Sequence, residues 1–275
     1  MTTAPRHDTL LRVLGRRLRV AQWSADGGER GEPALLILNG IGMNLELIEP
    51  LARALAPRRV VAFDMPGVGK SPDPVVPYNA VTMAMTASVL LDRLGLDRVD
   101  VMGISWGGGI AQQLALQHRS RVARLVLAAS SAGMMMVPGS AATLARFADP
   151  SNFRAGRAFH RTLAMLTNGG GGGAPVSLNA ATPPSPMGLL YQLVALLGWS
   201  SVPFLPWLDV PTLIVAGAED HVVPPLNARL LHALIPDSRL RLIDGGGHLF
   251  VLSHAAELVG ELETFLARDA AVESA

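Results

Sequence analysis

The 275-residue sequence contains no cysteine. A disulfide bond, a thiolate nucleophile and a cysteine-based metal site are therefore excluded. Lysine occurs once, at Lys70, so the other basic side chains are arginines. The 23 basic side chains are nearly balanced by 22 acidic ones, and the formal net charge is +1. A chain with so little net charge has no electrostatic reason to bind nucleic acid, and we expect no nucleic-acid partner.

Long uninterrupted apolar runs are also missing. The first 20 residues carry several arginines and an aspartate, so they lack the apolar core of a secretory signal. Residues 162–208 contain no Asp, Glu, Lys, Arg or His. The end of this stretch, Met187 to Leu208, is apolar but is interrupted by glycine, serine and proline, whereas a spanning helix needs about 20 consecutive apolar residues. We therefore expect a cytoplasmic protein without a transmembrane segment.

Short apolar runs typical of buried strands alternate with segments of helical periodicity. Such alternation predicts an α/β fold, with a mostly parallel central sheet flanked by helices on both faces. The first two strands are expected to be antiparallel edge strands. The expected strands are 10–13, 18–23, 34–38, 60–63, 99–102, 125–129, 212–215 and 240–243, and the expected helices are 44–56, 81–94, 107–118, 226–234 and 255–268.

The alternation stops between residues 134 and 208, where methionine, glycine and proline runs are poor sheet formers. We predict that residues 1–133 and 209–275 form one α/β core, and that 134–208 is a cap inserted over the carboxyl edge of the sheet. The chain length suits one such domain with an insertion.

The most informative motif is Gly103-Ile-Ser-Trp-Gly107, which lies between an expected strand and an expected helix. This is the pattern of a nucleophile elbow, in which a strained turn exposes a serine hydroxyl and glycines leave room for the backbone. Ser105 is therefore the candidate nucleophile, and the sequence predicts a serine hydrolase.

A serine nucleophile needs a base, and the base needs a carboxylate to orient it. His248, in a glycine-rich loop, is the candidate base. Asp220, which follows the strand at 212–215, is the candidate carboxylate, and the order Ser, Asp, His is the one used by this architecture. Glu219 is an adjacent competitor, and Asp244 is a weaker one because it lies so close to His248.

Acyl transfer also requires two backbone N–H groups that stabilise the oxyanion. The residue after the nucleophile, Trp106, is expected to provide one of them. The loop Asn39 to Gly42 follows the strand at 34–38, and the Ile41 N–H is expected to provide the other.

The stretch Gly67-Val-Gly-Lys-Ser71 resembles the end of a phosphate-binding loop. The complete motif requires glycine at position 64, where this chain has Asp64. We interpret the segment as a strand-end turn beside the active-site cleft. No histidine spacing indicates a metal site, so neither a metal nor a cofactor is expected.

Together these motifs resemble the α/β-hydrolase superfamily. Several segments resemble the intracellular depolymerases of medium-chain-length poly(3-hydroxyalkanoates) more closely. These segments are Asn39 to Leu47, Ala62 to Gly69, Gly103 to Gly108, Leu189 to Ser200 and Gly247 to Phe250. The resemblance implies hydrolysis of ester bonds in a storage polyester through an acyl-enzyme, without a cofactor, by a protein that can sit on storage granules.

The uncharged cap is expected to hold the substrate. Asn39, Leu193, Leu197 and Trp199 are the predicted substrate-binding residues, with the leucines at near-helical spacing. An apolar cap suits an aliphatic polyester or another hydrophobic ester, but an ordinary buried cap over an acyl pocket has the same composition. Two other functions stay open: a small-molecule carboxylesterase or carbon–carbon bond hydrolase, and a granule coat protein without turnover.

Overall fold

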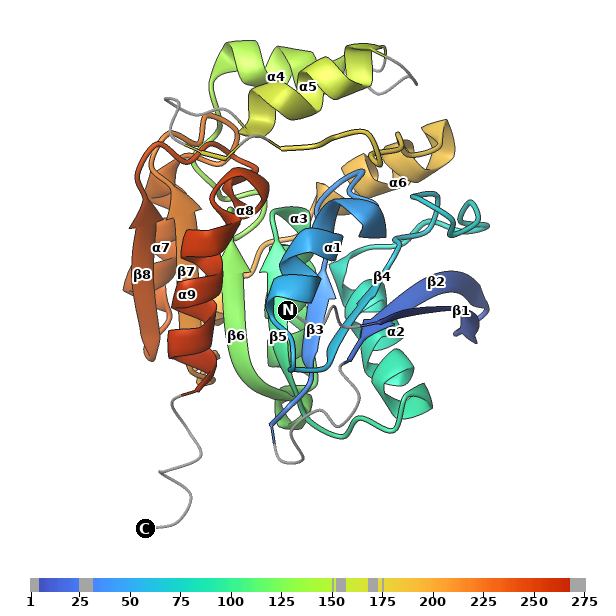
Figure 1. Ribbon diagram of the computed structural model, residues 1–275. Helices are drawn as coiled ribbons and strands as arrows, with labels where there is room; N and C mark the ends of the chain where they lie inside the picture. The colour runs from blue at the N-terminus through green and yellow to red at the C-terminus, as the bar shows by residue number, and fades with distance from the viewer. Residues whose placement is uncertain are drawn as a thin grey trace.

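A central eight-stranded sheet organises the computed structural model, which describes residues 5–24, 32–149, 151, 157–167, 173–174 and 176–267 (Figure 1). The strand order is β1-β2-β4-β3-β5-β6-β7-β8. The strands are β1 (Arg6–Val13), β2 (Arg16–Trp23), β3 (Leu35–Leu38), β4 (Val60–Phe63), β5 (Val99–Ile104), β6 (Val122–Ala128), β7 (Thr212–Gly217) and β8 (Ser238–Ile243).

The pairing confirms the predicted sheet. β1 pairs with β2 and β2 with β4 in antiparallel fashion, whereas β4, β3, β5, β6, β7 and β8 run parallel. In β3, Leu36 and Leu38 join one apolar cluster, while Leu35 and Ile37 join the other. All four are buried because the strand is covered on both faces, which explains its uninterrupted apolar run.

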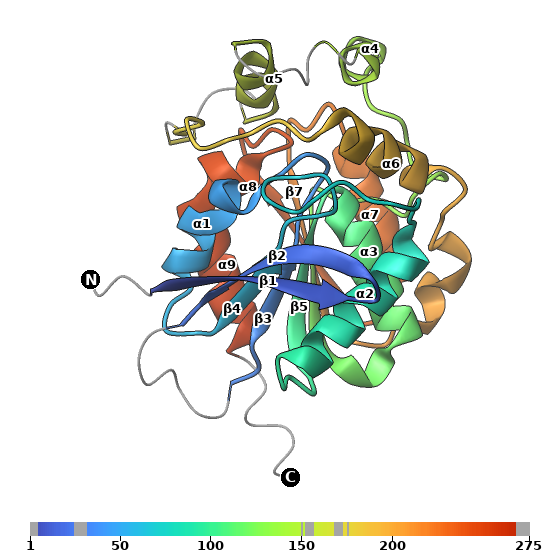
Figure 2. The same cartoon turned by 90° about the vertical axis from the view of Figure 1, so that its right-hand side faces the viewer.

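Helices cover both faces of the sheet (Figure 2). One layer contains α2 (Ala80–Arg93), α3 (Trp106–Gln117) and α7 (Pro225–Leu234), and the other contains α1 (Leu45–Ala54), α8 (Phe250–Ser253) and α9 (Ala255–Leu266). A short 3-10 helix, η1 (Arg119–Arg121), precedes β6. None of the helices in the described ranges combines the length and the hydropathy needed to cross a bilayer.

In the described part of the chain, four further elements lie between β6 and β7. They are α4 (Ala141–Ala148), α5 (Arg157–Thr167), α6 (Pro186–Leu196) and the 3-10 helix η3 (Val202–Trp207). α4, α5 and α6 lie over one end of the sheet in both views (Figures 1 and 2). α4 and α5 are not among the helices expected from the sequence. The glycine run at 169–173 falls mostly outside the described residues, and the division into core and cap at 134–208 stays a prediction.

The turn after β4 is folded around the side chain of Asp64. The Asp64 carboxylate accepts the backbone N–H groups of Lys70 at 3.0 Å and of Leu45 at 2.8 Å. A phosphate would need such N–H groups for itself. The glycine-rich turn is therefore folded around its own carboxylate, which supports the interpretation as a strand-end turn.

An ion cluster joins this turn to the sheet edge and to α1. Arg19 pairs with Asp64 at 3.2 Å and with Glu46 at 2.7 Å. Burial raises the pKa of Glu46, but the hydrogen bond from Arg19 and the charges of Arg19 and Arg6 outweigh it and lower the pKa to about 2. The folded state therefore favours the ionised carboxylate of Glu46.

Glu46→Gln is expected to lower the free energy of unfolding by about 1 to 2 kcal/mol at pH 7, after allowance for solvent screening. Because the pKa of Glu46 is depressed in the folded state, its contribution is complete above the ordinary value of 4.5 and is lost as the pH falls toward about 2. Urea denaturation of both proteins at pH 7 and pH 3 measures the effect. The same difference at both pH values would contradict it.

Candidate active site

Ser105 lies at the sharp turn between β5 and α3. Its backbone has φ 54° and ψ −120°, a region that a residue with a side chain rarely adopts. The Ser105 N–H donates to Ala128 O at 2.8 Å, which ties the turn to the neighbouring strand β6. This is the geometry that projects a serine side chain beyond the end of a sheet.

The glycines around Ser105 are required by close backbone approach. A Cβ at Gly107 would lie 1.9 Å from the carbonyl oxygen of Leu38, and a Cβ at Gly103 would lie 2.4 Å from the Cα of Gly108. Both distances are far inside van der Waals contact. The motif therefore has a steric reason here: α3 starts directly against β3 and β5.

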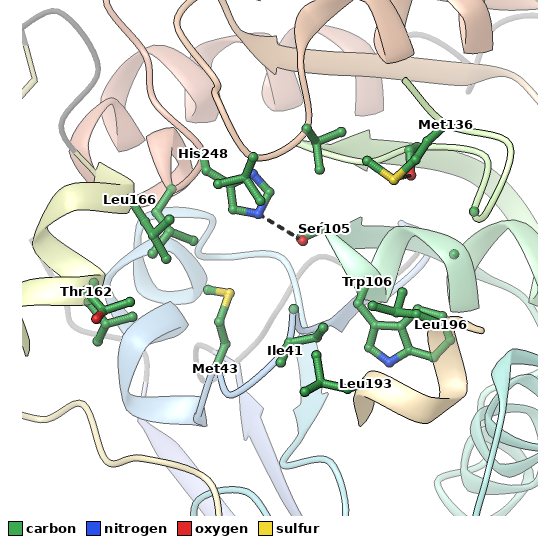
Figure 3. Close-up of a pocket in the computed structure, with 18 of the residues that line it drawn as sticks. Ile41, Met43, Ser105, Trp106, Met136, Thr162, Leu166, Leu193, Leu196 and His248 are labelled. Carbon is green, nitrogen blue, oxygen red and sulfur yellow. Dashed lines mark hydrogen bonds between the residues drawn. The ribbon is translucent and has the colours of Figure 1, made fainter. Parts of the chain in front are cut away.

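Three side chains predicted from the sequence form one hydrogen-bonded line. Ser105 Oγ lies 3.0 Å from His248 Nε2 (Figure 3). His248 Nδ1 lies 2.7 Å from Asp220 Oδ2. Asp220 and His248 are buried, whereas Ser105 is partly exposed at the cavity. They come from the ends of β5, β7 and β8, which the parallel sheet brings to one edge.

The carboxylate of Asp220 is held in place by the turn that follows it. Its Oδ1 accepts the N–H groups of Val222 at 2.8 Å and of Val223 at 2.9 Å, which leaves Oδ2 for His248. The competitors occupy different positions. Glu219 is only half-buried and Asp244 is exposed, and neither is paired with His248 among the described contacts.

The two predicted oxyanion donors both line the same cavity as Ser105. Gly40 is packed so closely that a Cβ there would lie 3.2 Å from the Ser105 Cβ, and Ile41 follows it. Within the described part of the chain, no protein acceptor is found for the N–H of Ile41 or of Trp106. Free N–H groups beside the nucleophile are what an oxyanion hole requires.

The cavity has a volume of about 250 Å³ and is lined mainly by apolar side chains (Figure 3). His248 is the one ionisable side chain among its lining residues in the described ranges. The full lining is Gly40, Ile41, Met43, Ser105, Trp106, Gly109, Ser131, Gly133, Met136, Phe159, Thr162, Leu163, Leu166, Leu193, Leu196, Trp199, Val222, Val223, His248 and Leu249. Such a cavity suits an uncharged, hydrophobic acyl group.

Only two of the four predicted substrate-binding residues line the cavity. Leu193 and Trp199 line the cavity. Leu197 is 68 % exposed at the end of α6 and does not line it. Asn39 is buried behind the loop, where its Nδ2 donates to Met43 O at 3.3 Å. Leu197 and Asn39 therefore do not line the cavity, because one is exposed to solvent and the other braces the loop, and their part in substrate binding stays a prediction.

Part of the cavity wall was not predicted from the sequence. Phe159, Thr162, Leu163 and Leu166 of α5 line it, as does Met136. The α5 residues recur every three or four positions, so helical periodicity was the available signal. The structural role of Gln192 of α6, which does not line the cavity, was also not predicted, because a polar residue within an apolar helix has no local pattern that indicates its partner.

Comparison with known proteins adds independent evidence. Residues 33–255 match the family described as alpha/beta hydrolase fold. A poly(3-hydroxyalkanoate) depolymerase of Ectopseudomonas oleovorans is 40 % identical over 240 residues, which cover 86 % of this chain and 84 % of that protein. A 2-hydroxymuconate semialdehyde hydrolase of Pseudomonas putida is 31 % identical and covers 95 % of this chain and 97 % of its own length.

Solved structures agree with this fold. A hydrolase from Pseudomonas aeruginosa PA01 superposes with a TM-score of 0.76 at 26 % identity, over 94 % of this chain and 98 % of that one. The predicted resemblance and fold class are both confirmed.

Proposed function

The chain belongs to the alpha/beta hydrolase fold family, and from that premise we propose that it is a serine hydrolase that cleaves the ester bonds of an aliphatic poly(3-hydroxyalkanoate). The observation that carries the proposal is the Ser105–His248–Asp220 line, which ends in an apolar cavity. The identity of 40 % to a poly(3-hydroxyalkanoate) depolymerase supports the substrate class.

The first half of the proposed reaction acylates Ser105. His248 Nε2 takes the hydroxyl proton as Ser105 Oγ attacks the ester carbonyl carbon. The carbonyl oxygen becomes an oxyanion, which the N–H groups of Ile41 and Trp106 stabilise. His248 then donates the proton to the leaving alkoxide, and the ester C–O bond breaks.

The second half releases the acid. A water molecule attacks the acyl-enzyme while His248 again acts as the base, and the Ser105 oxygen leaves with the proton. Throughout, Asp220 stabilises the imidazolium of His248 and holds its Nδ1 proton in place. The step needs no metal ion and no redox partner, because water supplies the nucleophile.

The character of the cavity favours an ester over an anionic substrate. A carboxylate-bearing substrate, such as a semialdehyde of a dicarboxylic acid, would require a cation in the cavity to offset its desolvation. No Arg or Lys is found among the lining residues in the described part of the chain. A carbon–carbon bond hydrolase therefore ranks below an ester hydrolase.

α6 offers a way to reach an insoluble polymer. Its inner face contributes Leu193 and Leu196 to the cavity. A second set of apolar side chains on the same helix and its end is 42 to 68 % exposed at spacings of three or four residues, and consists of Met187, Leu190, Val194 and Leu197. We call this set the α6 stripe, and we propose that it rests on the polyester at the granule surface.

The enzymatic proposal is tested by labelling and turnover. A fluorophosphonate is expected to modify Ser105, identified by peptide mass, and labelling should fail in Ser105→Ala. Without labelling, the coat-protein alternative holds. In a separate assay, unlabelled enzyme is given an emulsified medium-chain polyester, a nitrophenyl butyrate and a muconate semialdehyde. Release of hydroxy acids from the polymer supports the substrate class, and turnover restricted to a soluble substrate contradicts it.

Leu197→Asp is expected to reduce polyester hydrolysis about tenfold or more while nitrophenyl ester hydrolysis changes less than about twofold, because a charge on a docking surface must be desolvated. The melting temperature should stay constant, since Leu197 is 68 % exposed. Leu193→Asp is expected to depress both activities, because Leu193 lines the cavity. Leu10→Asp, on the edge strand β1, is the matched exposed control. Equal losses on both substrates in Leu197→Asp would contradict docking through the α6 stripe.

A further inference from the structure

Gln192 joins α6 to the loop that carries a proposed oxyanion donor. Its side chain is fully buried, and its Oε1 accepts the backbone N–H of Gly42 at 2.8 Å. Gly42 directly follows Ile41 and lies 150 positions before Gln192 in the chain. A polar side chain in an otherwise apolar helix therefore holds this loop.

The loop is a tight turn with a rotatable central peptide. The N–H of Met43 donates to the carbonyl oxygen of Gly40 at 3.2 Å, which closes a four-residue turn with Ile41 and Gly42 at its centre. Gly42 has φ +68°, the sign found at the third position of a type II turn. Type I and type II turns differ in the orientation of the central peptide.

The hydrogen bond to Gln192 selects one of these orientations. The Gly42 N–H belongs to the central Ile41–Gly42 peptide, so an acceptor on one side of the turn holds that peptide against rotation. It also fixes the turn as a whole against α6, and a shift of the turn would move the Gly40–Ile41 peptide and with it the Ile41 N–H. Because an oxyanion donor acts only when it is aimed at the developing charge, this restraint bears on the transition state.

The second proposed donor is contacted by the same segment of chain. The ring of Trp199 packs edge-on against the ring of Trp106, with centroids 6.4 Å apart and an interplanar angle of 87°. Trp199 Nε1 also donates to Gln113 Oε1 on α3 at 2.9 Å. The stretch from Gln192 to Trp199 thus contacts Trp106 and also Gly42, the residue next to Ile41.

We propose that Gln192 is a positioning residue that sets the oxyanion hole from α6. The inference rests on the proposed serine hydrolase function and assigns to the helix a role in rate as well as in substrate binding. The neighbouring Leu193 lines the cavity, so the helix that contacts the acyl chain is also the helix that aims a donor at its carbonyl. Gln192 touches neither the reacting atoms nor the cavity.

The test compares Gln192→Met with Gln192→Glu on the full-length protein. Gln192→Met keeps the side-chain length and removes the acceptor, and it is expected to lower kcat for nitrophenyl butyrate about 10- to 100-fold with KM changed less than about threefold. Binding of a trifluoromethyl ketone, which forms an oxyanion on Ser105, should weaken by a similar factor. Gln192→Glu retains an acceptor oxygen and is expected to recover most of kcat. Gln22→Met, on β2, is the matched control.

The outcomes separate the inference from the proposed function. If the wild-type protein is not labelled by a fluorophosphonate, the proposed function fails first. If it is labelled and Gln192→Met keeps the wild-type kcat and inhibitor affinity, the inference is overturned. A lowered melting temperature with equal loss in Gln192→Met and Gln192→Glu would show a merely structural role and also overturn it. Selective loss of kcat and inhibitor affinity, rescued by Gln192→Glu, supports it.

Discussion

Ser105→Ala and His248→Ala are each expected to reduce kcat for a nitrophenyl ester by about 10⁴-fold or more, because a triad acts as a unit and the loss of one member leaves the others without a function. Folding should survive. Ser105 is partly exposed, and among the described residues its hydroxyl pairs with His248 alone, so its removal leaves unpaired only the Nε2 of His248, which lines the cavity. Steady-state kinetics and circular dichroism of both variants provide the measurement.

The double variant sharpens this prediction. If Ser105 and His248 act together, the double replacement is expected to be no slower than either single one, apart from background. His254 lies close in sequence and is a matched control, because its Nδ1 is engaged with Ser253 Oγ at 2.9 Å. His248→Ala with more than about a tenth of the wild-type turnover would identify a different base.

Asp220→Asn is expected to lower kcat by about 10³- to 10⁴-fold, and Glu219→Gln by less than about threefold. The asparagine oxygen can still accept the N–H groups of Val222 and Val223, so the turn keeps its shape. Its amide group would then donate toward His248 Nδ1, which forces the wrong tautomer of the imidazole. The two variants are thus expected to differ greatly in kcat despite their adjacent positions.

Kinetics over pH 5 to 9, together with the melting temperature of each variant, give the decisive comparison for the carboxylate. A lower kcat in Asp220→Asn at an unchanged melting temperature would show that the substitution impairs catalysis and not folding. A larger loss in Glu219→Gln than in Asp220→Asn would move the carboxylate role to Glu219 and contradict the geometry described above.

Local patterns in the sequence predicted the core of the fold well. Strand β3 is recognisable because a strand buried on both faces needs apolar side chains at every position. The elbow is recognisable because the backbone around Ser105 leaves no space for a Cβ at Gly103 or Gly107. Boundaries were less well predicted: β6 begins at Val122, three residues before the expected start, since strand ends depend on neighbouring strands.

The cap region was poorly predicted for a physical reason. α4 and α5 have no sheet strands beside them to impose an alternating pattern, and their neighbours in sequence are rich in glycine and proline. The spacing of Leu189, Leu193 and Leu197 indicated a helix, and α6 is there. Spacing did not show which side of α6 faces the cavity, and only the structure showed that Leu193 lines the cavity whereas Leu197 is exposed.

The sequence by itself determined the class of fold, the nucleophile elbow and the candidates Ser105, Asp220 and His248, because each depends on short-range sterics or on chain order along a parallel sheet. Only the tertiary structure decided between Asp220 and Glu219 as the partner of His248, and only it paired Gln192 with Gly42. The first decision rests on a hydrogen bond between residues that are 28 positions apart, and the second on one between residues that are 150 positions apart. Such contacts have no periodic trace in the sequence, because they depend on how whole elements pack and not on what adjacent residues prefer.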